Sequence, residues 1–127
     1  MKNIFILLTL FLLTSCNNSN GTDAATSASA GYINVTPEEF KLLMAKPNTV
    51  ILDVRTPVET DRGVIEGAVK LDYKSKDFDK NVNALDKNKT YLLYCHAGGR
   101  SSNTCKVMKD KGFNRLYNLD GGYAGWE

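Results

Sequence analysis

Short apolar runs that alternate with helical patterns constrain the fold of this chain more than any other feature. Residues 49–54 and residues 90–94 are nearly continuous apolar runs of strand length. Such runs are typical of strands that are buried on both faces of a parallel sheet. The segments between them carry apolar residues at helical spacing. The sequence therefore predicts an α/β domain with a mostly parallel central sheet and helices on both faces.

The expected elements follow one another from residue 33 to residue 119. Thr36, Pro37 and Glu39 are typical of a helix start, where they serve as N-cap, first-turn proline and third-position acid. In chain order, the predicted strands are 33–35, 49–54, a brief one within 64–71, 90–94 and 115–119. The first predicted helix begins at residue 36. The other predicted helices span 56–61, 77–85 and 100–111, and Gly112 ends the last one.

The N-terminal residues have the pattern of an export signal rather than of a folded segment. Lys2 precedes an apolar run over residues 4–13, which is shorter than the roughly 20 residues of a membrane-spanning helix. The sequence Leu-Thr-Ser-Cys at residues 13–16 resembles a bacterial lipobox, which is cut before a cysteine that then carries the lipid. We therefore predict a signal peptide over 1–15 and lipidation of Cys16, which would anchor the protein to a membrane in the cell envelope, facing the periplasm or the outside. A simple secretion signal with a chance cysteine is the alternative.

Composition separates a tether from the folded domain. Residues 17–31 contain only Asn, Ser, Gly, Thr, Asp and Ala, so they cannot bury apolar surface, and residues 16–31 are expected to form a lipidated, flexible tether. The folded domain is expected over residues 32–127, the length of one domain. The chain has 16 Lys and Arg against 14 Asp and Glu, with a formal net charge of +2. This balance gives no electrostatic basis for binding nucleic acid.

The chemistry that the sequence predicts is centred on Cys95, which directly follows the predicted strand 90–94. The loop and helix start after it are His96, Ala97, Gly98, Gly99, Arg100 and Ser101. Ligands of parallel sheets bind beyond the carboxyl ends of the strands. Backbone N–H groups of a small-residue loop, a helix N-terminus and the cation of Arg100 all favour the thiolate. We expect an accessible thiolate nucleophile with a low pKa; a buried structural cysteine is the alternative.

Four motifs, in order, resemble those of the rhodanese family of sulfurtransferases. They are Asp-Val-Arg at 53–55 with Glu59, Gly-Val-Ile-Glu-Gly-Ala at 63–68, Cys-His-Ala-Gly-Gly-Arg-Ser at 95–101, and Leu-Asp-Gly-Gly-Tyr-Ala-Gly-Trp at 119–126. The second motif has Val64 and Glu66 where the family has His and Pro, and in the family this segment is structural. The resemblance implies a rhodanese-like fold for the domain.

The resemblance also implies a reaction. Cys95 would take a sulfane sulfur from thiosulfate, a polysulfide or a persulfide, and pass it to cyanide or a thiol through a Cys95 persulfide. Residues 96–101 would hold the terminal sulfur, with Arg100 pointing inward and orienting an anionic donor. No metal and no organic cofactor are expected. The expected partners are a small sulfur-donor anion, a thiol or cyanide acceptor and, in an oxidising compartment, a partner thiol protein.

Two other functions stay open. One is a non-catalytic rhodanese-like binding module, since domains of this type exist that have lost the cysteine. The other is a phosphatase or arsenate reductase. Related folds use a Cys-x5-Arg loop around a tetrahedral oxyanion, whereas Cys95 and Arg100 form Cys-x4-Arg. By family resemblance, the shorter loop suits a single sulfur.

The remaining candidate residues have structural interpretations. Asp53 and Arg55 are expected to support the loop, with substrate contact as the alternative, and the spacing allows an ion pair between Arg55 and Glu59. His96 is expected to line the loop rather than to act as a base. Tyr123 and Trp126 are expected to pack the end of the domain.

A second cysteine of the domain, Cys105, shares a helical face with other small and apolar residues. These are Ser101, Thr104 and Met108. Cys105 is therefore expected to be a buried small hydrophobe. It lies roughly 7 Å along the helix from the helix start, so we expect no direct disulfide with Cys95.

Overall fold

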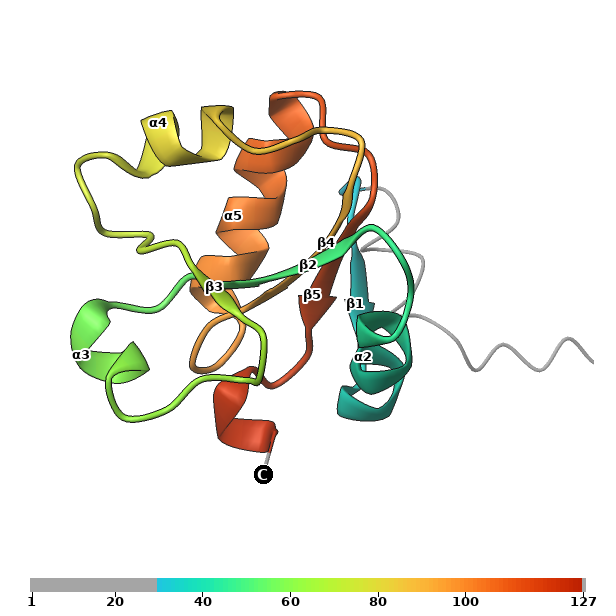
Figure 1. Cartoon of the computed structure of the whole chain (residues 1–127), viewed down its shortest axis with the longest axis vertical. Helices are drawn as coiled ribbons and strands as arrows, with labels where there is room; N and C mark the ends of the chain where they lie inside the picture. The colour runs from blue at the N-terminus through green and yellow to red at the C-terminus, as the bar shows by residue number, and fades with distance from the viewer. Residues whose placement is uncertain (1–29, 127) are drawn as a thin grey trace, which may run out of the picture.

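The structure, a computed structural model, describes residues 30–126 of the chain. Five strands form one sheet in the order β1-β5-β4-β2-β3, and the neighbouring strands are parallel, which confirms the predicted α/β fold (Figure 1). In chain order the elements are β1 (Ile33–Val35), α2 (Pro37–Met44), β2 (Thr49–Asp53), α3 (Pro57–Thr60), β3 (Val69–Lys70), α4 (Phe78–Asn83), β4 (Thr90–Tyr94), α5 (Gly99–Asp110), β5 (Leu116–Leu119) and the 3₁₀ helix η1 (Tyr123–Gly125).

The elements lie where the sequence patterns place them, and only their ends shift by one or two residues. The predicted helix 77–85 ends early because the N–H of Leu85 donates to the carbonyl of Val82, three residues back, at 3.1 Å. This spacing belongs to a tighter turn than an α-helix. At the start of α2 the predicted capping box is present: the N–H of Thr36 donates to the carboxylate of Glu39 at 2.9 Å, and the reverse contact is 3.2 Å.

The sheet separates two hydrophobic cores. Side chains alternate along β4, so Tyr91 and Leu93 lie in one core while Leu92 and Tyr94 lie in the other. The first core also contains Val82 of α4 and Cys105 and Met108 of α5, and the second contains Phe40 of α2. Helices therefore cover both faces of the sheet, as predicted (Figure 1).

The carboxyl ends of the central strands β2 and β4 lie side by side. Asp53 is in register with Tyr94, and the N–H of Val54 donates to the carbonyl of Tyr94 at 3.0 Å. On the other side of β2, the N–H of Leu71 donates to the carbonyl of Asp53 at 2.8 Å. Because all the strands are parallel, the segments that follow β2, β4 and β5 leave from the same edge of the sheet.

Several N-terminal predictions lie outside the described residues: the signal peptide over 1–15, the lipidated Cys16 and the tether up to residue 29. The described chain begins at Ala30, which packs against the first core. The hydroxyl of Tyr32 lies 2.6 Å from the hydroxyl of Ser102, so the start of the domain contacts α5. None of the helices within residues 30–126 has the length and apolar character that a membrane-spanning helix needs.

Candidate active site

Cys95 directly follows β4 and lies at the carboxyl edge of the sheet. Its side chain continues the alternation of β4 and enters the first core, on the face covered by α5. Only 2% of Cys95 is exposed, so the prediction of an accessible thiol is wrong for this structure. The thiol is covered because the loop after β4 folds back over it, and the first turn of α5 starts beside it.

Donors from the loop and from α5 surround the Cys95 sulfur. The N–H of Gly98 donates to Sγ at 3.0 Å, and the hydroxyl of Ser101 lies 3.4 Å from Sγ. Gly98 is the N-cap of α5 and has a φ of 108°, which a residue with a side chain adopts only under strain. The left-handed glycine therefore lets the chain turn sharply from the strand into the helix and directs an N–H group at the sulfur.

These donors favour the deprotonated form of Cys95. Burial by itself raises the pKa of the thiol, since it disfavours the charged form. The Ser101 hydroxyl and the N–H groups of Ser101, Gly98 and Ala97 act in the opposite direction, and together they hold the pKa of Cys95 below its ordinary value. The hydrogen bonds at Sγ therefore shift the equilibrium toward the thiolate, which is the nucleophilic form of cysteine.

Alkylation kinetics test the contribution of Ser101. Because the pKa of Cys95 is lowered, its reaction with iodoacetamide should persist to a lower pH than that of an ordinary thiol. Ser101→Ala removes a hydrogen bond to the charged form, so the reaction near neutral pH should slow by about tenfold. The measurement is the alkylation rate of Cys95 against pH, followed by peptide mass. An unchanged pH profile in Ser101→Ala would show that the hydroxyl does not stabilise the thiolate.

Arg100 lies in the first turn of α5 and is held by Glu59 of α3. Its guanidinium donates through Nη1 to Oε2 at 2.8 Å and through Nη2 to Oε1 at 2.7 Å, a bidentate ion pair. The pKa of Arg100 is raised mainly by this hydrogen bond to Glu59, with a smaller contribution from the nearby Cys95. Arg100 therefore lies near Cys95, as expected, but both of its outer nitrogens are bound to a carboxylate and are not free to receive a donor.

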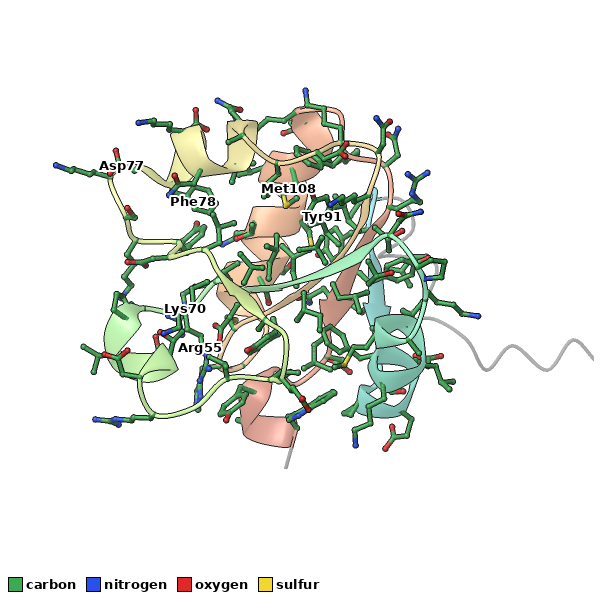
Figure 2. All side chains as sticks on the ribbon, viewed as in Figure 1. Arg55, Lys70, Asp77, Phe78, Tyr91 and Met108 are labelled. Carbon is green, nitrogen blue, oxygen red and sulfur yellow. The ribbon has the colours of Figure 1, made fainter. Side chains whose placement is uncertain are left out.

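Arg55 pairs with Asp53, and Glu59 pairs with Arg100, so the Arg55–Glu59 ion pair that the spacing allowed does not form. Arg55 precedes the first residue of α3, and the helical i to i+4 spacing does not apply there. Its Nη2 instead lies 2.7 Å from Oδ2 of Asp53, and both side chains are buried. Arg55, which is labelled in Figure 2, also donates to the carbonyl of Gly63 at 2.7 Å, and its guanidinium carbon lies 4.0 Å from the ring centroid of Tyr123. This geometry is that of a support for the loops at the edge.

The C-terminal turn holds the backbone of the Cys95 loop from behind. The N–H of Tyr123 donates to the carbonyl of Cys95 at 2.8 Å, and the N–H of Ala124 donates to that of His96 at 3.0 Å. A Cβ on Gly122 would lie 2.6 Å from the Cys95 oxygen and 2.5 Å from the His96 oxygen. Sequence reasoning identified a turn at the glycine pair but missed this contact; the only signal was the glycine pair itself.

The expected packing of the C-terminal aromatic residues is present. Tyr123 stacks on Tyr94 with ring centroids 6.0 Å apart, and Trp126 meets Phe40 edge to face at 5.6 Å. The hydroxyl of Tyr94 accepts a hydrogen bond from the N–H of Ile65 at 2.9 Å. The segment 63–68, which departs from the family pattern, is therefore joined to the rest of the domain by hydrogen bonds of its backbone groups, the N–H of Ile65 and the carbonyl of Gly63.

The two cysteines of the described region differ in environment, and both are free thiols. Cys105 is fully buried in the first core, as predicted, and burial raises the pKa of its thiol. His96 is exposed at the surface of the loop. Within residues 30–126, no group of His, Cys, Asp and Glu side chains is arranged to hold a metal ion.

The structure is thus a parallel α/β domain that holds a hydrogen-bonded thiol in a short loop at the end of a central strand. The chain belongs to the rhodanese family: the model of the rhodanese-like domain matches residues 36–127. A rhodanese-like domain protein from Staphylococcus aureus has the same fold, with a TM-score of 0.64 and 32% identity, and the match covers 74% of this chain and 90% of that one.

Relatives of this chain carry different names. The thiosulfate sulfurtransferase GlpE of Glaesserella parasuis is 27% identical over 75% of this chain and 86% of that protein. YtwF of Bacillus subtilis, named provisionally as a sulfurtransferase, is 36% identical over 61% of this chain and 72% of that protein. A tRNA uridine(34) hydroxylase of Agrobacterium fabrum is 34% identical over 69% of this chain, but the match spans only 29% of that protein. The chain thus matches less than a third of the hydroxylase.

Proposed function

We propose that this protein is a sulfurtransferase that carries a sulfane sulfur on Cys95. The observation that carries the proposal is the Cys95 thiol at the end of β4, held by the Gly98 N–H and the Ser101 hydroxyl. These groups stabilise a thiolate before the reaction. They are also placed to stabilise the charge of a persulfide, because preorganised N–H groups act on a developing anion without reorganising. The name of GlpE supports the same chemistry.

The reaction proceeds in two halves. The Cys95 thiolate attacks the sulfane sulfur of the donor; a bond from Sγ to that sulfur forms, the donor bond breaks, and its electron pair leaves with the remainder of the donor, which is sulfite when the donor is thiosulfate. A nucleophilic acceptor then attacks the terminal sulfur and Cys95 leaves as the thiolate. With cyanide the product is thiocyanate. This is a ping-pong sequence through a covalent intermediate.

The site geometry supports this function over the two alternatives. A binding module without chemistry has no need of a lowered thiol pKa, whereas the pKa of Cys95 is lowered by groups aimed at its sulfur. A phosphatase has to surround a tetrahedral oxyanion, and the loop here has four residues between Cys95 and Arg100. The only arginine of that loop is already bound to Glu59. The hydroxylase name is not carried over, because those relatives share only this domain.

Intact mass spectrometry tests the proposal. The purified protein is treated with thiosulfate or with polysulfide, and we expect a mass gain of one sulfur atom at Cys95. Addition of cyanide should reverse the gain and release thiocyanate. Protein that has a free Cys95 thiol and gains no sulfur from either donor would contradict a sulfurtransferase function and make aryl phosphate and arsenate assays the next step.

We further propose that the protein acts in the cell envelope, attached by a lipid on Cys16. The support is the lipobox-like sequence at residues 13–16 and the small polar residues that follow it. Expressed in a bacterium, the protein should enter the detergent phase with a mature N-terminus at residue 16, and Cys16→Ser should abolish both properties. A wild-type protein that keeps residues 1–15 in a detergent-free fraction would contradict the anchor.

A further inference from the structure

The loop around Cys95 contains one permanent cation, and that cation is neutralised. Residues 95–99 include no Lys or Arg, and Arg100 follows them. Both outer nitrogens of Arg100 donate to the carboxylate of Glu59, at 2.8 and 2.7 Å. The pair is only partly exposed, at 24% for Arg100 and 30% for Glu59. Next to the sulfur, therefore, lies an ion pair with no net charge rather than a free guanidinium.

Glu59 is fixed in this position by a second set of bonds. Its Oε2 accepts from the N–H of Thr56 at 3.0 Å and from the hydroxyl of Thr56 at 2.8 Å, which caps the start of α3. To release Arg100, Glu59 would have to give up this cap as well. The hydrogen bond from Arg100 is also the main reason that the pKa of Glu59 lies far below its usual range, so the carboxylate stays charged at physiological pH.

The other arginine at this edge is engaged in the same way. Arg55 is bound to Asp53 through Nε and Nη2, and its Nη2 also donates to the carbonyl of Gly63. The two arginines of the site are thus matched by two carboxylates. Apart from these paired arginines, the groups that attract a negative charge are the N–H and hydroxyl donors at Sγ, which stabilise one sulfur anion.

This charge balance matters because sulfur donors differ in charge. Thiosulfate is a dianion, and it brings two negative charges to a site that already holds a thiolate. Its leaving group, sulfite, is also a dianion. A hydropersulfide is partly ionised at neutral pH, but the form that is attacked is the uncharged RS–SH: the Cys95 thiolate attacks the outer sulfur, the S–S bond of the donor breaks, and RS⁻ leaves while Cys95–S–SH forms. No oxidant or reductant is consumed in this exchange, and the total charge in the site stays at −1.

We infer that Glu59 determines donor specificity: by neutralising Arg100, it makes the site select hydropersulfide donors over thiosulfate. This inference rests on the proposed sulfurtransferase function and narrows its substrate class. Glu59 acts through Arg100 and does not touch the reacting atoms, so it is a positioning residue. The preference follows from repulsion between like charges in a partly buried site, where solvent screens them incompletely.

Loading rates with two donors test the inference. The purified full chain is mixed with thiosulfate or with the hydropersulfide of 2-mercaptoethanol, and sulfur uptake at Cys95 is followed by intact mass. In the wild type, loading from the hydropersulfide should exceed loading from thiosulfate by about 100-fold in kcat/KM. Glu59→Gln keeps an oxygen that can cap α3 but removes the charge. It should raise the ratio of thiosulfate to hydropersulfide loading by about tenfold.

Asp61 offers a matched control. It lies at the end of the same helix, is 75% exposed and pairs with Lys70 at 3.7 Å rather than with Arg100. Asp61→Asn removes the same charge from the protein, and the donor ratio should not change. An equal shift in Asp61→Asn and Glu59→Gln would assign the effect to net charge and overturn the role of Glu59.

Ionic strength gives a second readout that needs no variant. Salt screens repulsion between like charges, so loading of the wild type from thiosulfate should accelerate as ionic strength rises, whereas loading from the hydropersulfide should not respond. Faster loading from thiosulfate than from the hydropersulfide, slowed by salt, would overturn the inference while leaving the sulfurtransferase function intact. Failure of both donors to load Cys95 would instead contradict the function itself.

Discussion

Cys95→Ser is expected to abolish sulfur loading and transfer. A serine hydroxyl remains protonated in this loop, and its oxygen cannot form the persulfide that the reaction requires. Loss of a covalent nucleophile removes at least about three orders of magnitude in turnover. The measurement is the mass gain with polysulfide together with the rate of thiocyanate release. Because the loop keeps its backbone hydrogen bonds to the C-terminal turn, the variant should unfold at nearly the wild-type temperature.

Cys105→Ala is the control for this experiment. Cys105 is fully buried in the first core, its thiol pKa is raised, and it is not bonded to Cys95. The variant should lose some stability, because the smaller side chain leaves a cavity in the core. It should still load one sulfur at the wild-type rate. Full transfer activity in Cys95→Ser, or sulfur located on Cys105, would refute Cys95 as the carrier.

Gly122→Ala is expected to disrupt the Cys95 loop, although Gly122 itself lies in the C-terminal turn. Its φ of 60° disfavours any residue with a Cβ, and the new methyl group would lie 2.5 to 2.6 Å from the carbonyl oxygens of His96 and Cys95. These oxygens belong to the backbone and cannot move without displacing the thiol. We expect a loss of about 3 kcal/mol in the free energy of unfolding, together with a marked fall in the loading rate. Denaturant unfolding and intact mass measure the two effects.

Two other glycines near the same turn separate the effect of backbone strain from that of the steric contact with the loop. Gly121 has a φ of 74°, but no atom lies within 4 Å of the point that a Cβ would occupy, so Gly121→Ala should show only the backbone strain, about 1 kcal/mol. Gly125 has neither a positive φ nor a close neighbour, and Gly125→Ala should be nearly neutral. If Gly122→Ala behaves like Gly125→Ala, the turn does not hold the loop in place.

Local patterns in the sequence were sufficient to predict the strands, the start of α2 and the position of Cys95. A cap such as that of Thr36 depends on residues three positions apart, and a strand depends on its own apolar run. The partner of Arg100 was not predictable in this way. Glu59 lies 41 residues earlier in the chain, and the two meet only because α3 and α5 start at the same edge of the folded sheet.

The same limit explains the incorrect predictions. The spacing of Arg55 and Glu59 suggested a helical ion pair, but Arg55 lies before the helix and turns back to Asp53. The burial of Cys95 depends on how the loop and α5 cover the thiol, and the role of Gly122 depends on how the chain end packs behind the loop. No short segment specifies either contact. Residue types and spacing located the nucleophile, whereas tertiary contacts determine its charge environment and its cover.

The cover over Cys95 has a consequence for which molecules can react with it. With 2% of the residue exposed, a bulky reactant does not contact the thiol while the loop keeps this conformation. Each sulfur of a disulfide in a folded protein carries bulk on both sides, whereas a terminal sulfane sulfur is substituted on one side only. The cover should therefore favour reaction with a chain-end sulfur and disfavour a mixed disulfide between Cys95 and another protein.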